Sequence, residues 1–295
     1  MPEGERVQAL STASRPQGRP RPQGRPQSPD PSQVSLGDGD LDVVGRLTDA
    51  SNATLFAVLR TAAGEVPVVY KPVAGERPLR DFRHATLHRR EVATYRLDVA
   101  AGFATVPETV LREGPFGLGS VQRWVGPAPG EPVEAGAGVV DVLTVDEVPP
   151  GWLEVVRAYD QIGHEVVLCH ADDERLAAMA VLDVLANNAD RKGGHVLDAG
   201  SGRIAGVDHG LTFHTDDKLR TVLWGWAGRP VPQPLLDAVQ EVADQLGTGP
   251  LGAELSELLD PDEVQALDRR CRRLLRSGRF PRPGGGGPSI PWPAF

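Results

Sequence analysis

Cysteine and long apolar runs are both scarce in this chain of 295 residues. Its 2 cysteines, Cys169 and Cys271, lie far apart, which excludes a disulfide framework and a zinc cluster built from cysteines. No apolar run approaches the roughly 20 residues that span a bilayer. The N-terminus also lacks the charged and then apolar pattern of a secretory signal. We therefore expect a cytoplasmic protein without a membrane span.

Positive charge is in deficit, and lysine especially so. The formal net charge is −9. A protein whose main partner is nucleic acid needs a basic surface, so we expect no nucleic-acid partner. Nearly all basic residues are arginines, and the lysines are Lys71, Lys192 and Lys218. A chain that avoids lysine this strongly gives weight to each lysine that it keeps.

Both ends of the chain have a biased composition. Residues 1–38 are rich in Pro, Arg, Gln and Gly, and residues 278–295 are rich in Pro and Gly. Such segments bury too little apolar surface to offset the entropy lost on ordering. We therefore predict a disordered N-terminal arm and a disordered tail around a folded unit.

The folded unit divides into two lobes. Residues 39–125 form the predicted N-lobe, with one helix over about 78–100 and strand patterns over 43–47, 54–60, 66–71, 103–111 and 119–125. Residues 126–277 form the hinge and C-lobe, and they begin with an acidic, Pro- and Gly-rich stretch, to about 150, that reads as flexible. Helices are predicted over about 172–187, 234–246 and 261–276, with a hairpin over 195–207. The predicted fold class is α+β, with a cleft between the lobes.

Two acidic residues of the C-lobe carry the strongest functional signal. Asp190 follows a buried helix in the polar loop Asn-Asn-Ala-Asp-Arg-Lys-Gly-Gly-His, and Asp208 lies in an Asp-x-Gly turn. The hairpin between them brings loop and turn to one end of a small sheet. Phosphoryl transfer uses such a pair, one carboxylate beside the acceptor hydroxyl and another holding the metal on the nucleotide phosphates. The structural alternatives are a polar helix-terminal turn for Asp190 and a strand-ending turn for Asp208.

Lys71 and Glu91 form a second candidate pair. Lys71 ends a strand and can reach phosphates as a point charge. Glu91 lies on an otherwise apolar stripe of the predicted helix, and a carboxylate facing a core needs a cation. Lys71 is the nearest candidate. The alternative is a surface pairing of Glu91 with Arg89 or Arg90.

The order of these features resembles the protein-kinase-like fold. The Asn-x-Asp-Arg form of the loop is similar to the phosphatidylinositol 3-/4-kinase and HipA-type branches, and the chain resembles an actinobacterial family with such catalytic motifs over roughly 43–215. The resemblance implies that Lys71 contacts the nucleotide phosphates, Glu91 braces it, Asp190 is the catalytic carboxylate and Asp208 binds the metal. It places Arg191 and Lys192 in the catalytic loop. It also implies adenine near the segment between the lobes, at Gln122, Trp124 and Val125.

Two positions depart from the kinase pattern. Kinases generally have a metal-binding Asn five residues after the catalytic Asp, and here that residue is His195. Magnesium prefers oxygen ligands, whereas imidazole suits transition metals. The nucleotide loop is not Gly-x-Gly-x-x-Gly; its counterpart is small and polar, and could offer backbone amides, the Ser51 hydroxyl and Asn52 to phosphates.

The sequence thus predicts an ATP-dependent phosphotransferase that uses Mg²⁺ or Mn²⁺ and acts on a hydroxyl of a protein or a small molecule. His195 favours a different class, a nucleotide-binding pseudokinase or scaffold without turnover. A third alternative is AMP transfer on the same fold.

Overall fold

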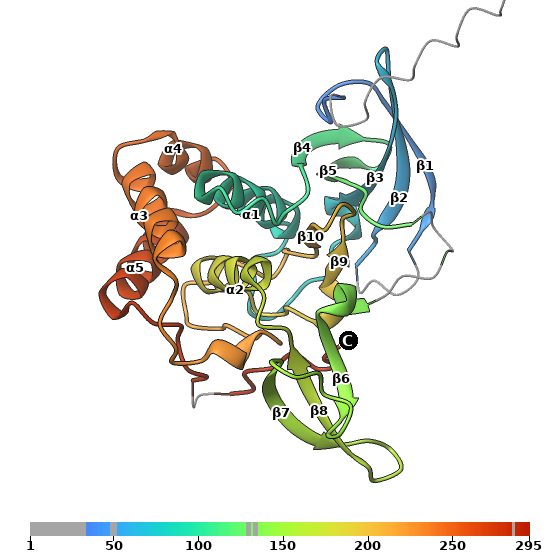
Figure 1. Ribbon diagram of the computed structural model, residues 1–295. Coiled ribbons are helices and arrows are strands. Elements are labelled where there is room, and N and C mark those ends of the chain that lie inside the picture. The colour runs from blue at the N-terminus through green and yellow to red at the C-terminus, as the bar shows by residue number, and fades with distance from the viewer. Residues whose placement is uncertain (1–33, 48–51, 128–130, 132–134, 285–286) are drawn as a thin grey trace, which may run out of the picture.

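The structure, a computed structural model, describes residues 34–47, 52–127, 131, 135–284 and 287–295. Its N-lobe is a five-stranded antiparallel sheet with the strand order β1-β2-β3-β5-β4 (Figure 1). The strands are β1 (Asp40–Arg46), β2 (Leu55–Thr61), β3 (Gly64–Pro72), β4 (Thr109–Gly114) and β5 (Gly117–Arg123). On β3, Val66, Val68 and Tyr70 alternate into the core, which leaves Lys71 on the opposite face.

The N-lobe core reaches further towards the N-terminus than expected. Val34 and Leu36 are 3% and 0% exposed and pack with Leu41 and Leu59. Residues 34–38, which the sequence assigned to the arm, therefore belong to the N-lobe, because two apolar side chains among them pack into its core. Residues 1–33 lie outside the described part of the chain.

Helix α1 (Leu87–Ala101) connects the two lobes. It begins well after the expected residue 78, because the distant Glu76 carboxylate accepts the N–H groups of Leu87 and His88 and so takes the place of a local N-cap. Its side chains Ala93 and Leu97 belong to the core of the C-lobe. Figure 1 shows α1 between the N-lobe sheet and helices α3 and α4. The helix assigned to the N-lobe therefore packs largely on the C-lobe.

A three-stranded sheet, which the sequence did not predict, follows the N-lobe. It has the order β6-β8-β7 and contains β6 (Val140–Thr144), β7 (Leu153–Tyr159) and β8 (Glu165–His170). Strand β6 lies inside the stretch expected to be a flexible hinge up to residue 150. Val140, Leu153 and Leu168 anchor this sheet in the C-lobe core, although much of β6 and β7 is exposed. The acidic, Pro- and Gly-rich composition of the stretch up to residue 150 concealed Val140.

The C-lobe is built around α2 (Glu174–Ala186), which is buried on almost all sides as its composition predicts. A hairpin of β9 (Val196–Asp198) and β10 (Ile204–Gly206) follows it. Helices α3 (Gln233–Gly247), α4 (Pro250–Ser256) and α5 (Pro261–Ser277) close the lobe, and only α4 among them was not expected. Short 3-10 turns occur at Val73–Gly75, Ala135–Gly138, Gly193–His195 and Trp224–Trp226. The two-lobed α+β fold with a catalytic-loop hairpin is confirmed.

The described residues of the tail lie against the C-lobe, in contrast to the predicted disorder over 278–295. Phe280 is 5% exposed and stacks on Trp226. The carbonyl of Ser289 accepts the indole N–H of Trp224 at 2.8 Å, and the carbonyl of Ala294 accepts the N–H of Gly193 at 2.8 Å. These few apolar contacts and backbone hydrogen bonds order the described part of the tail in spite of its Pro- and Gly-rich composition. Among the described residues, none of the helices combines the length and apolar character needed to cross a membrane.

Candidate active site

Three charged side chains from three distant segments meet where the lobes face each other. The Lys71 ammonium group, at the end of β3, lies 2.5 Å from Oε1 of Glu91 on α1 and 2.8 Å from Oδ1 of Asp208, in the turn after β10. Lys71 and Glu91 are largely buried, with side chains 19% and 3% exposed, whereas the Asp208 side chain is 54% exposed. The pairing of Lys71 with Glu91 expected from the sequence is present. Arg90, the alternative partner, binds Glu263 instead, at 2.5 Å.

The electrostatics of this cluster favour the charged forms of Lys71 and Asp208. Burial lowers the pKa of Lys71, but the charges of Asp208 and Glu91 outweigh it and leave the pKa raised. The Lys71 charge in turn lowers the pKa of Asp208 against the opposing effect of burial. The cluster therefore presents an ammonium and an exposed carboxylate side by side at neutral pH.

The Asp208 turn is held in a conformation that side chains rarely adopt. Asp208 has φ of +60°, in the left-handed region, which an aspartate tolerates better than most residues. Oε2 of Glu91 accepts the N–H of His209 at 2.9 Å, while Oε1 faces Lys71. One buried carboxylate thus connects β3 with the turn. A strained residue fixed by its surroundings is a feature of functional sites.

Asp190 lies close enough to this cluster for the charge of Asp208 to act on it. It follows α2, which ends at a left-handed C-cap residue, Asn187, and its N–H donates to the Asn188 side chain at 3.0 Å. Burial raises the pKa of Asp190, and the Asp208 charge raises it further, while the Lys192 charge opposes both. The Lys192 ammonium is 3.4 Å from Asp190 Oδ2. A carboxylate with a raised pKa is the stronger base.

Arg191, which the sequence placed among the catalytic residues, has a different position. It is 0% exposed, and its guanidinium binds the Asp183 carboxylate of α2 at 2.9–3.2 Å. It also donates to the Val207 carbonyl at 3.1 Å and to His209 Nε2 at 2.7 Å. With its donors directed inward, Arg191 fastens the loop of Asp190 to the turn of Asp208. We correct its assignment from a catalytic residue to a positioning residue.

Asp183 and His209 escaped the sequence analysis. Asp183 is 1% exposed and also accepts the amide of Asn188 at 2.9 Å. A lone acid in an apolar helix requires a buried cation, which was the available signal. His209 is 1% exposed, and burial lowers its pKa well below the usual value. It accepts from Arg191, so it is neutral with its proton on Nδ1.

His195 lies beside Asp208, as the sequence predicts for a pair of metal ligands. Its Nε2 is 3.5 Å from Asp208 Oδ2, and its Nδ1 faces the N–H of Lys192 at 3.5 Å. Burial lowers the pKa of His195 to about 4, so it is neutral at pH 7. With Nδ1 as acceptor, Nε2 carries the proton towards Asp208. Ligation of a metal by Nε2 requires the other tautomer.

The described residues that were expected around the nucleotide base and phosphates belong to the N-lobe and to the segment that follows β5. Gln122 on β5 is 6% exposed and its amide donates to Thr109 at 2.9 Å, so its side chain is engaged within the sheet. Trp124 and Val125 are half-buried and follow β5, and Trp124 packs edge-on against Phe56. Asn52 accepts the N–H of Arg77 at 2.9 Å. Ser51 lies outside the described residues.

The donor set at the turn limits how a metal could be held. Within the described residues, no group of three or more His, Cys, Asp or Glu side chains forms a ready metal site. Asp208 offers an exposed carboxylate, and His195 is the nearest further donor. This fits a divalent cation that takes one or two ligands from the protein and the rest from phosphates and water, as Mg²⁺ commonly does.

Comparisons with known proteins identify the family of this chain through its sequence. No family model matches the chain. Among solved structures it is similar to the Helicobacter pylori proinflammatory kinase CtkA, at 10% identity and a TM-score of 0.47, over 84% of this chain and 95% of that chain. It is also similar to a chain of the Shewanella oneidensis MR-1 toxin–antitoxin complex of HipA, HipB and operator DNA, at 14% identity and a TM-score of 0.37, over 80% of this chain and 65% of that chain. These similarities concern the fold alone.

The sequence comparison is more specific. The chain is 48% identical to protein Rv2133c of Mycobacterium tuberculosis over 270 residues, which is 90% of this chain and 96% of that protein. A match of this length includes most of both lobes. The chain belongs to the family of Mycobacterium tuberculosis protein Rv2133c.

Proposed function

We propose that this protein is an ATP-dependent phosphotransferase that acts on a hydroxyl group of a protein or a small molecule. The observation that carries the proposal is the Lys71 ammonium held between Glu91 and Asp208, at 2.5 and 2.8 Å. A strand lysine braced by a helix glutamate and adjoining a turn carboxylate is the arrangement that kinases use on nucleotide phosphates. The Asn-x-Asp-Arg loop supports the phosphatidylinositol 3-/4-kinase-like and HipA-type branch, without implying a lipid substrate.

The nucleotide phosphates would meet Lys71, and the exposed carboxylate of Asp208 would hold Mg²⁺ or Mn²⁺. Such an ion, when bound, neutralises the charge that develops on the phosphates. Lys71 contributes a fixed positive charge that does not need to reorganise, because Glu91 and Asp208 already hold it. The adenine would lie near Trp124 and Val125, which follow the strand paired with β3.

Asp190 would act on the acceptor. It takes the proton of the acceptor hydroxyl as the new O–P bond forms and the bond from the γ-phosphorus to the ADP oxygen breaks. Its raised pKa improves it as a base, and the charge of Lys192 at 3.4 Å opposes that rise in pKa. The Arg191 clamp keeps this loop next to the Asp208 turn.

Transfer of radiolabelled phosphate from γ-labelled ATP, to the protein itself or to water, tests the proposal without knowledge of the acceptor. We expect labelled product in the presence of Mg²⁺ or Mn²⁺. Asp190→Asn should lower the rate by about 10²–10⁴, the usual contribution of a general base. Lys71→Met should lower it by about 10²–10³. Arg203→Met, which removes an exposed cation from the hairpin turn, is the matched control and should leave the rate unchanged.

One observation favours a second candidate, a nucleotide-binding protein without turnover. His195 occupies the position of the second metal ligand and faces Asp208 through the nitrogen that carries the proton. In that case ATP binds, Lys71→Met weakens the binding, and no phosphate or AMP is transferred with either metal. That result would remove the phosphotransferase and retain the cleft.

A further inference from the structure

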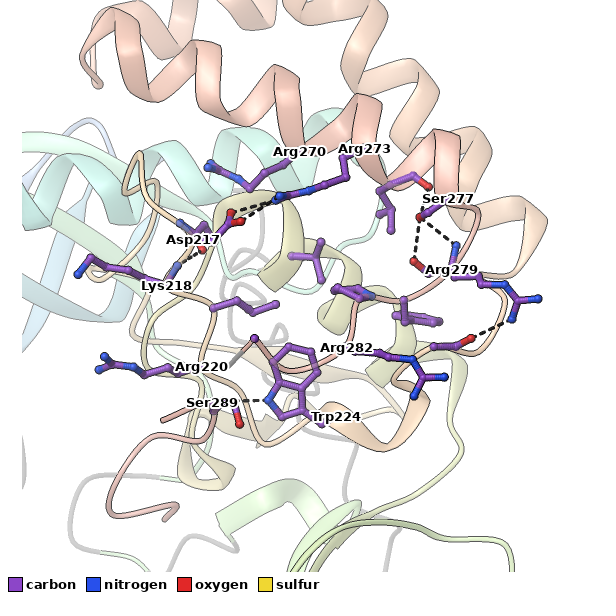
Figure 2. Close-up of a pocket in the computed structure, with 18 of the residues that line it drawn as sticks. Asp217, Lys218, Arg220, Trp224, Arg270, Arg273, Ser277, Arg279, Arg282 and Ser289 are labelled. Carbon is purple, nitrogen blue, oxygen red and sulfur yellow. Dashed lines mark hydrogen bonds and ion pairs between the residues drawn. The ribbon is translucent and has the colours of Figure 1, made fainter. Parts of the chain in front are cut away.

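A cavity of about 710 Å³ lies in the C-lobe, apart from the Lys71–Asp208 cluster. It is lined by residues near the C-terminal ends of α2 and α5, by residues of 217–224, and by residues of 279–284 and 287–289 (Figure 2). This volume falls within the range of small-ligand pockets, about 300–1,000 Å³. Trp224 and Phe280 supply apolar surface to its wall.

The cavity is lined by basic side chains in a chain that is acidic as a whole. Its described lining includes one acidic residue, Asp217, and six basic ones: Lys218, Arg220, Arg270, Arg273, Arg279 and Arg282. Asp217 is held by Arg273 through two bonds of 2.9 and 3.0 Å, and Lys218 pairs with Asp81 at 2.7 Å. The remaining four arginines form no ion pair with a carboxylate within the described residues, although the charge of Asp217 acts on Arg270.

Arg270 is the residue that most needs a partner. Its side chain is 4% exposed; Nε donates to the Leu185 carbonyl at 2.7 Å and Nη1 donates to the His214 carbonyl at 3.3 Å. Its Nη2 is buried and has no hydrogen-bond partner among the described residues. Burial lowers the pKa of Arg270 to about 10, so it remains charged at neutral pH. The Asp217 charge favours the charged form but does not offset the burial of Arg270, and a buried guanidinium whose donors are not all bonded is costly.

The surroundings of Arg270 are basic on both sides. It also lines an adjoining smaller cavity of about 400 Å³, whose described lining contains Arg269, Arg272, Arg273 and Arg276. Figure 2 shows Arg270 and Arg273 along one wall of the larger cavity, with Arg282 and Arg220 across from them. Arginines from several segments thus line this space, and the guanidinium group is well suited to bind phosphate groups.

We propose that this cavity binds a small soluble molecule bearing one or more phosphate groups, at a site separate from the nucleotide cleft. The phosphate oxygens take the free donor of Arg270 and the unpaired guanidinium groups of Arg220 and Arg282. The site adjoins the catalytic loop, because the backbone of Arg220 bonds to Asn188 and to Arg191 at 2.9 and 3.0 Å. The proposal does not depend on phosphotransfer at Asp190.

Inorganic pyrophosphate is a suitable probe, with the Lys71→Met protein as background so that binding to the cleft cation is removed. Isothermal titration and thermal unfolding should show saturable binding that raises the Tm and weakens with added salt. Arg282→Gln and Arg220→Gln should each weaken binding by roughly 3- to 10-fold. Arg46→Gln, which removes one exposed charge from β1, should leave it unchanged.

Three results would overturn the proposal. One is the absence of saturable pyrophosphate binding at low salt in the Lys71→Met protein. Another is equal weakening by Arg46→Gln and Arg282→Gln, which would indicate diffuse charge attraction. The third is cosedimentation with phosphatidylcholine vesicles carrying phosphatidic acid, abolished by Arg282→Gln, without binding of free pyrophosphate. That last result would assign the same phosphate chemistry to a lipid headgroup.

Discussion

Removal of the buried cation at position 191 should destabilise the protein more than a change at any exposed arginine. Arg191 and Asp183 are 0% and 1% exposed and meet at 2.9 Å. Arg191→Met leaves the Asp183 carboxylate buried, with only the Asn188 amide and a 3.4 Å contact to Thr221. Breaking a buried pair in this way costs about 3–5 kcal/mol. For a folded unit of this size that corresponds to a decrease in Tm of roughly 6–20 °C.

Urea unfolding followed by circular dichroism measures this cost. A second substitution isolates the interaction energy between Arg191 and Asp183 from the other effects of each change. Asp183→Leu combined with Arg191→Met replaces both charges by apolar groups. The double variant should be more stable than the sum of the single costs predicts, by about 1–3 kcal/mol. A loss below about 1 kcal/mol for Arg191→Met would refute a structural clamp, as would strict additivity. Either result would return Arg191 to the candidates for direct contact with substrate.

Three further outcomes follow from the site. Lys192→Gln removes a charge that lowers the pKa of Asp190, so the acidic limb of the rate–pH profile, where Asp190 gains its proton, should move to higher pH; an unmoved limb would contradict the role of this pair. His195→Asn offers an oxygen beside Asp208 and should raise the rate with Mg²⁺ relative to Mn²⁺, whereas an unchanged ratio would exclude a ligand role. Gly193→Ala puts a Cβ into the Phe295 ring and should cost about 1–3 kcal/mol, measured by urea unfolding. Phe295→Ala should relieve that cost, and a cost that is unchanged in the double variant would contradict the contact.

The parts of the site that could be predicted are those in which composition and spacing constrain the chemistry. Lysine is so rare that Lys71 stood out, and Glu91 on an apolar stripe required a cation, so their pairing followed from the cost of a buried charge. The loop of Asp190 could be predicted from the helix that precedes it, and its closeness to the turn of Asp208 from the hairpin that connects the two. These inferences rest on the scarcity of lysine and on the spacing of apolar residues along helices and strands, both of which can be read from the sequence.

The parts that could not be predicted depend on direction and on distant contacts. Arg191 is adjacent to Asp190 in the sequence, yet its side chain turns inward to Asp183, and adjacency carries no information about that. Strand β6 and the segment near Phe280 lie in stretches rich in Pro, Gly or acidic residues, where composition indicates a loop. A few apolar anchors decide their position, and those anchors gain meaning only once the C-lobe core is formed.

The central claim is that Lys71, Asp208 and Asp190 form one phosphotransfer site, and phosphate transfer from γ-labelled ATP tests it most directly. We predict metal-dependent transfer by the wild type, a decrease of about 10²–10⁴ in Asp190→Asn, and retained ATP binding in that variant. Transfer that persists undiminished in Asp190→Asn, or its absence in the wild type with both Mg²⁺ and Mn²⁺, would contradict the claim.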